Sequence, residues 1–196
     1  MRFVVALVVA LCALTVAAHA DRRVAENPAP CPADVTYDQY PVSGTTREEL
    51  KKALLSHGPT DPFGKRRYAT ATWHVRWKWE LTQQGLVDVS TLELSCSAVV
   101  KMPKLVPVHG MSKELLERWQ VFMERLLKHE MNHVRHAEER AGHVALALRA
   151  ATARRGMLTP TQADAVAQKA LQEIRELDRL YDERTDHGKT EGVWEL

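Results

Sequence analysis

His129-Glu130-Met131-Asn132-His133 is the stretch of sequence that decides how the chain folds around a site. In a helix it places two imidazoles one turn apart on one face, with a carboxylate beside them. Proteins hold Zn²⁺ in this way and place a general base next to the water that the metal activates. The stretch therefore predicts a helix with a zinc site, in which His129 and His133 are ligands and Glu130 is the base.

The flanks of this stretch, from 112 to about 153, predict a long helix. Ser112 is suited to cap its start, and Gly142 interrupts the pattern while the apolar spacing continues beyond it. Apolar residues recur at helical spacing on the side of the two histidines: Phe122, Leu126, Ala137, Val144 and Ala147. The histidines therefore face the core, where a dry environment strengthens the polarising effect of a metal ion.

Two segments before this helix alternate apolar and polar residues, which is the pattern of strands with one buried face. Their apolar positions are Trp73, Val75, Trp77 and Trp79 in 68–80, and Leu92, Leu94, Cys96, Ala98 and Val100 in 92–100. A turn near Gln84-Gly85 joins the two segments, so they predict an antiparallel hairpin. A further strand is predicted at 35–42.

Two more helices complete the predicted fold. Thr45 or Thr46 is suited to cap a short helix that ends at Gly58. Pro160, after Thr159, is suited to the first position of a last helix. Its apolar positions are Val166, Leu171, Ile174 and Leu177. The predicted fold class is α+β, with a small antiparallel β-sheet packed against the long zinc-binding helix and the C-terminal helix.

The first twenty residues have the features of a secretory signal. Arg2 precedes an apolar run, and the small residues Ala18 and Ala20 suit cleavage after Ala20. The run is too short to favour a membrane span, so we expect a periplasmic or secreted protein with no stable membrane anchor. The predicted regions are a signal peptide at 1–20, an extended arm at 21–33 and a single zinc-metallopeptidase-like domain at 34–196.

The charges of the chain are nearly balanced, with 27 Lys and Arg against 25 Asp and Glu. Proteins that bind nucleic acid usually carry a clear basic excess on one face. The composition therefore argues against nucleic acid as a partner, and it gives no oligomeric state.

Removal of the signal would also remove Cys12 and leave two cysteines, Cys31 and Cys96. An exported protein meets an oxidising compartment, where such a pair usually forms a disulfide. We therefore predict a Cys31–Cys96 bond that fastens the N-terminal arm to a central strand.

Two histidines do not complete a catalytic zinc site, which usually has three protein ligands and one open position. His136 lies near the same helix face, but it is seven residues beyond His129, about 10 Å along the axis. One ion cannot easily bridge His129, His133 and His136. The third ligand is therefore expected from another segment.

The last predicted helix and its end offer four candidates for that ligand. Glu173 and Glu176 belong to a charge-rich pattern that is typical of a solvated face. Asp182 and His187 lie at the end of the helix, where Gly188 suits a tight turn that folds back over a neighbouring helix.

The pair of motifs His129-Glu130-x-x-His133 and Tyr181-Asp182-x-x-Thr185-x-His187-Gly188 resembles a bacterial family of predicted secreted zinc-dependent proteases, known as a domain of unknown function (DUF922-like). Segments 40–44 and 105–107 and the Trp-rich strand are similar too, so the resemblance covers most of the chain after the signal. It implies a zinc site more strongly than a substrate class, because the protease label rests largely on the zinc motif. His136 departs from the pattern of the family.

We predict an exported zinc metallopeptidase in which His129, His133 and His187 hold Zn²⁺. His187 is preferred because the turn at Gly188 can deliver it while the apolar residues of the last helix stay packed inward. Asp182 is the closest rival, since a carboxylate is also a competent zinc ligand.

Glu130 and Tyr181 are the predicted catalytic residues. Glu130 would take a proton from the zinc's water, and Tyr181 would donate a hydrogen bond to the developing oxyanion of a peptide or protein substrate. The alternative is a non-catalytic periplasmic zinc-binding protein, in which a fourth protein ligand such as His136 closes the site.

Overall fold

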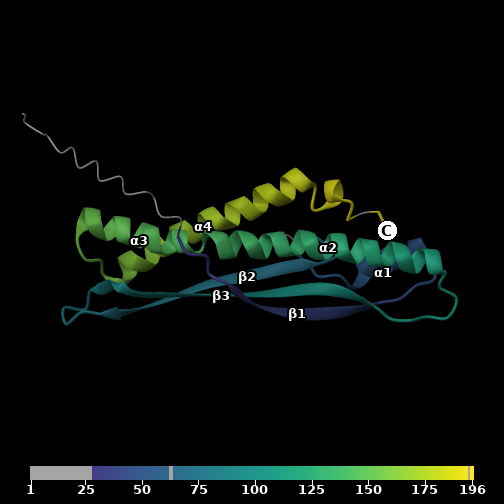
Figure 1. Ribbon diagram of the computed structural model, residues 1–196, viewed down its shortest axis with the longest axis horizontal. Helices are drawn as coiled ribbons and strands as arrows, with labels where there is room; N and C mark the ends of the chain where they lie inside the picture. Colours follow the sequence, from purple (N-terminus) through teal and green to yellow (C-terminus); the bar gives the residue numbers. More distant parts are fainter. Residues whose placement is uncertain (1–27, 62–63, 194) are drawn as a thin grey trace, which may run out of the picture.

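Three strands form one sheet in the computed structural model, which describes residues 28–61, 64–193 and 195–196. They are β1 (Ala33–Val42), β2 (Thr70–Leu81) and β3 (Val87–Leu105), with β3 in the middle (Figure 1). β2 and β3 form the predicted antiparallel hairpin, in which Trp73 lies opposite Ala98. The α+β class predicted from the sequence is confirmed.

The first strand differs from the prediction in its direction. β1 runs parallel to β3, from Ala33 opposite Cys96 to Val42 opposite Leu105, so the sheet is mixed and not wholly antiparallel. A parallel pair needs a crossover connection, and α1 (Arg47–His57) together with β2 supplies it. Alternation of apolar residues predicts which face of a strand is buried, but it does not predict the direction of the neighbouring strand.

The helices begin where capping residues predict. Thr46 and Thr159 form capping boxes at the starts of α1 and α4 (Pro160–Thr185), and Ser112 caps α2 (Lys113–Arg140) with its side chain. A short helix, α3 (Gly142–Arg155), follows α2, and the 3-10 turn η1 (Lys189–Glu191) follows α4. Figure 1 shows α2, α3 and α4 on the same side of the sheet.

The break between α2 and α3 accommodates the N-terminal arm. A Cβ atom on Gly142 would collide with Pro28 and lie 3.0 Å from the carbonyl oxygen of Ala29, so the glycine allows the arm to cross here. The arm then bonds to Glu138 of α2, whose backbone and side-chain oxygens accept the N–H groups of Cys31 and Ala33 at 2.9 and 2.8 Å. The Cys31–Cys96 disulfide fastens its end to β3, as predicted.

The predicted signal peptide at 1–20 and the beginning of the predicted arm lie outside the described residues. Within the described ranges, no helix is long and apolar enough to cross a membrane. The division of the chain into regions at 20 and 33 stays a prediction.

The apolar core fixes how α2 and α4 face each other. Phe122 and Leu126 of α2 pack on the helix-facing side of the sheet, so the stripe that contains the two histidines points inward. Leu171 and Ile174 of α4 pack against Val75 of β2, as their spacing predicts. Asp178 and Asp182 follow one and two turns further along α4, and they therefore meet the buried face of α2.

The disulfide predicts a measurable contribution to stability. Cys31→Ala with Cys96→Ala should lower the free energy of unfolding by about 2–5 kcal/mol, because the bond joins residues 65 positions apart and restricts the unfolded chain. Denaturant unfolding would measure the loss. Cys31→Ala alone is the matched control, since it breaks the bond but keeps the buried sulfur of Cys96. Two titratable thiols in native, unreduced protein would contradict the bond itself.

Candidate metal centre

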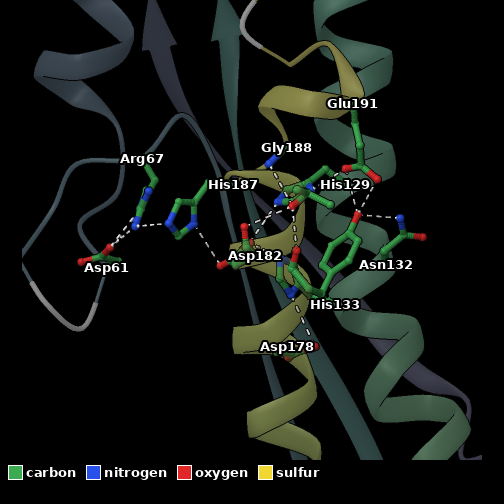
Figure 2. Close-up of polar contacts among 12 residues, drawn as sticks. Asp61, Arg67, His129, Asn132, His133, Asp178, Asp182, His187, Gly188 and Glu191 are labelled. Atoms are coloured by element: carbon green, nitrogen blue, oxygen red, sulfur yellow. Dashed lines mark hydrogen bonds and ion pairs between the residues drawn. The ribbon is translucent and has the colours of Figure 1, made fainter.

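The histidine pair of α2 meets a carboxylate of α4 (Figure 2). His129 and His133 are buried, and their Nε2 atoms lie 3.3 and 3.2 Å from Oδ1 of Asp182. Donor atoms around a tetrahedral ion with bonds of about 2.0 Å are about 3.3 Å apart. The three side chains therefore have the types and the spacing of a group that could hold a metal ion, although they come from two helices.

A second carboxylate contacts the other nitrogen of each ring. Nδ1 of His129 lies 2.8 Å from Oε2 of Glu191, and Nδ1 of His133 lies 3.4 Å from Oδ1 of Asp178. A carboxylate can only accept, so each Nδ1 carries a proton. Ligating histidines usually have such an outer partner, which fixes the ring with its Nε2 toward the metal. Both rings are thus aimed at Asp182.

The charges in this group are strongly coupled. Burial alone would lower the pKa of His133, but hydrogen bonds to Asp178 and Asp182 raise it to about 10. Burial would raise the pKa of Asp182, yet His129 and His133 hold it well below its ordinary value. The Nε2 protons and the carboxylate therefore stabilise one another. A metal cation that replaced the Nε2 protons would face the same negative charge of Asp182.

Glu130 lies on the side of α2 that faces β2 and is only 5 % exposed. The backbone N–H of Ala71 donates to its carboxylate, and His133 and His129 act on it electrostatically. Burial nevertheless raises the pKa of Glu130 above its ordinary value. A carboxylate with a raised pKa beside the histidine pair is suited to accept and return a proton near neutral pH.

Tyr181 packs against the histidines with its ring and contacts Glu191 with its hydroxyl. The ring stacks on His129 at 5.0 Å between centroids, and the hydroxyl donates to both carboxylate oxygens of Glu191 at 3.0 and 2.9 Å. The same hydroxyl accepts from Asn132 at 2.8 Å. These contacts orient Glu191 and His129. The role of Tyr181 as an oxyanion donor stays a prediction. In this structure its hydroxyl is hydrogen-bonded to Glu191 and Asn132.

His187 lies beside the group but is not part of it. Its Nδ1 is 3.3 Å from Oδ2 of Asp182, and its Nε2 faces Arg67 at 3.1 Å. The backbone of Asp186 and His187 is left-handed, with φ of 48° and 53°, and this turn carries the ring away from the histidine pair. The structure thus groups Asp182, the predicted rival, with the histidine pair, and the ligand role of His187 stays a prediction.

The two glutamates that were also candidates lie apart from the group. Glu173 is exposed, and Glu176 pairs with Arg179 on the surface of α4 at 2.6 Å. Both belong to the solvated face that their charge pattern predicted.

A second possible metal group overlaps the first and consists of His133, His136 and Asp178. Nδ1 of His136 is 2.7 Å from Oδ1 of Asp178, and the indole N–H of Trp73 donates to the other carboxylate oxygen. Both oxygens of Asp178 are thus hydrogen-bonded, and this carboxylate already supports His133. Both groups could hold a metal ion, and in the first of them Asp178 serves as the outer partner of His133.

The turn after α4 explains the second sequence motif. The hydroxyl of Thr185 donates to the carbonyl of Tyr181 at 2.9 Å and accepts the N–H of Gly188 at 3.2 Å. Gly188 has φ of 82°, and a Cβ atom there would lie 2.8 Å from Val193 and 3.2 Å from the ring of His129. Only glycine fits this position, and the close approach brings Glu191 to Nδ1 of His129.

Sequence reasoning missed three residues of this site, namely Asp178, Glu191 and Arg67. Asp178 lies one turn before Asp182 on the same face of α4, so the i, i+4 spacing of the two carboxylates was a usable signal. Glu191 and Arg67 reach the site only through turns, and their sequence positions contain no periodic signal.

Comparison with known protein families gives a match over most of the chain. The model of a family described as "Bacterial protein of unknown function (DUF922)" matches residues 37–188. The match includes both motifs and ends before Glu191. No curated protein and no solved structure has detectable similarity to the chain.

The packing at Gly188 predicts a selective loss of stability. Gly188→Ala should lower the free energy of unfolding by about 2–5 kcal/mol, since strain at positive φ costs about 1–2 kcal/mol and overpacking about 1–3 kcal/mol more. Gly85→Ala is the matched control, because Gly85 also has a positive φ, at 71°, and open space around it. It should show the strain alone. Equal losses in the two variants, measured by denaturant unfolding, would exclude the packing of Gly188 on His129.

Proposed function

This chain belongs to the DUF922 family of bacterial proteins of unknown function, and we propose that it is an exported zinc metallopeptidase. The observation that carries the proposal is the convergence of both Nε2 atoms on one oxygen of Asp182, with Glu130 buried beside them. Two histidines and a glutamate at this helical spacing are the signature of helix-borne metallopeptidase sites.

The donor set supports zinc as the metal. Two imidazoles and one carboxylate are ligands that zinc accepts, and three protein ligands leave one position for water or substrate. When bound, zinc would supply a Lewis acid that activates water and polarises a carbonyl group. His129 and His133 would be kept in place by Glu191 and Asp178.

Glu130 is assigned the role of general base. Its carboxylate would accept a proton from the attacking water and return it to the amine of the cleaved peptide bond. Burial raises its pKa, which suits a group that must both accept and release a proton.

Access to the site is from the side of Asp182 and His187. About a third of each of these side chains is exposed, at 32 % and 34 %, whereas the histidine pair and Glu130 are buried. A peptide substrate would therefore meet the site beside the exposed parts of Asp182 and His187.

The disulfide supports export. A Cys31–Cys96 bond is stable in the periplasm or outside the cell and rare in the cytoplasm. The proposed location, periplasmic or secreted, agrees with the predicted signal peptide and gives the protein access to extracytoplasmic peptides or proteins.

A second candidate function is zinc binding without catalysis. The 5 % exposure of Glu130 favours it, because a base that water cannot reach would serve only as a neighbour of the ligands. The two functions predict different rates of peptide hydrolysis for wild type and for a variant in which Glu130 has lost its charge.

The ligand assignment predicts which variants lose zinc. Wild type should bind one zinc ion, whereas His129→Ala, His133→Ala and Asp182→Asn should each weaken binding by about 100-fold or more, since even outer partners contribute 10–100-fold. Competition with a chromogenic chelator would measure the affinity. Glu176→Gln is the control and should bind as wild type does. Undiminished binding by Asp182→Asn would remove Asp182 from the site.

The assignment of Glu130 predicts a separation of binding from chemistry. Glu130→Gln should keep zinc affinity and fold but lower the rate of peptide hydrolysis by about 10²–10⁴-fold, because it removes the base and no ligand. Cleavage of a peptide library by zinc-loaded protein would measure this rate. Equal cleavage by wild type and variant would reject the mechanism, and no cleavage by zinc-loaded wild type would favour binding alone.

A further inference from the structure

A chain of polar contacts joins the connection between α1 and β2 to the metal centre (Figure 2). Asp61 pairs with Arg67 at 2.8 Å, the Nη2 atom of Arg67 lies 3.1 Å from Nε2 of His187, and Nδ1 of His187 lies 3.3 Å from Oδ2 of Asp182. Arg67 and His187 are 120 positions apart in the sequence. Only the tertiary structure brings them together.

The chemistry of the guanidinium group determines which ring nitrogen of His187 accepts a hydrogen bond. A guanidinium can donate hydrogen bonds but cannot accept them, and it stays charged in proteins. Nε2 of His187 must therefore accept from Arg67 and carry no proton. The ring proton is then on Nδ1, where it can be donated to Oδ2 of Asp182. The contact with Arg67 thus favours the tautomer of His187 that carries its proton on Nδ1.

This tautomer matters for the carboxylate that we assign to the metal. With Oδ2 of Asp182 held by His187, Oδ1 is the oxygen that faces the two Nε2 atoms of the histidine pair. A direct bond from Arg67 to Asp182 would place a full positive charge beside the ion. With His187 between them, the Nδ1–H group orients the carboxylate while the guanidinium group stays further from the ion.

We propose that Arg67 is a positioning residue, which acts through His187 to orient Asp182 for metal binding. The proposal rests on the metal site of the proposed function. It assigns His187 to the outer shell of that site as a hydrogen-bond donor, where the sequence predicted a ligand.

The connection that carries Arg67 is built to hold it. Asp61 accepts from both Nε and Nη2 of Arg67, and its other carboxylate oxygen accepts the N–H of Lys65 at 2.8 Å. The N–H of Arg67 donates to the carbonyl of Pro59 at 2.9 Å. The side chains of Arg67 and Asp61 are only 18 % and 10 % exposed, so moving the guanidinium away would separate a largely buried ion pair.

The first test examines the ring of His187 in metal-free protein. Nitrogen NMR of ¹⁵N-histidine-labelled wild type at neutral pH should show a protonated Nδ1 and an unprotonated, hydrogen-bonded Nε2 for His187. In Arg67→Met the ring should lose this fixed state and give averaged nitrogen signals. A proton on Nε2 in wild type, or unchanged signals in Arg67→Met, would overturn the proposal.

The second test measures zinc affinity by chelator competition. Arg67→Met should bind zinc about tenfold more weakly than wild type, as is usual for loss of an outer partner. Arg67→Lys, which keeps a donor for Nε2, should recover part of the loss. Arg66→Met is the matched control, because Arg66 lies on the same connection but donates to the carbonyl of Gly58. It should bind as wild type does.

Variants of His187 separate the outer role from direct ligation. His187→Asn keeps an N–H donor near Oδ2 of Asp182 and should bind zinc more tightly than His187→Phe, which has none. If His187 were itself a ligand through Nε2, both variants would lose zinc equally and Arg67→Met would bind it more tightly, since Arg67 competes for that nitrogen. That pattern would overturn the positioning role.

Failure of this proposal can be told apart from failure of the proposed function. Loss of zinc in His129→Ala together with unchanged affinity in Arg67→Met would reject the positioning role alone. Wild type that binds no zinc would reject both, while the nitrogen signals of His187 would still report whether Arg67 fixes the ring. Hydrolysis is not needed for either measurement.

Discussion

The contact on which the rest of the site depends is the approach of two buried imidazoles on α2 to one carboxylate of α4. Ionisable groups on the apolar face of a helix are costly unless partners compensate for their lost hydration. Asp182 meets both rings, and Asp178 and Glu191 meet their outer nitrogens. The packing of α4 on α2 therefore allows the histidine pair to be buried at all.

Other parts of the fold maintain this contact from three directions. The indole of Trp73 reaches from β2 to Asp178, the turn at Gly188 packs on His129, and Arg67 holds His187 against Asp182. Each support acts on a carboxylate or an imidazole and not on the backbone of the helices. The orientation of the His129 and His133 rings is thus fixed at both nitrogens of each ring, in a fold with only a small three-stranded sheet.

The same arrangement separates two roles that one sequence motif combines. The rings of His129 and His133 point from α2 to Asp182 of α4, while Glu130 points toward β2 and the backbone of Ala71. The proposed metal and the proposed base are therefore supported by different neighbours. Burial therefore raises the pKa of Glu130, whereas the carboxylates of Asp178 and Asp182 raise the pKa of His133.

The sequence by itself determined what depends on local spacing: the helix with His129 and His133 on its buried face, the hairpin of β2 and β3, the helix caps and the pairing of Cys31 with Cys96. The spacing of apolar residues, the capping residues and the oxidising compartment expected for an exported protein predict these features without knowledge of distant contacts. The parallel direction of β1, the approach of Asp182 to the histidine pair, and the contacts of Glu191 and Arg67 were decided by the tertiary structure. They depend on contacts between segments that are far apart in the chain, such as Arg67 and His187, and residue spacing does not encode those contacts.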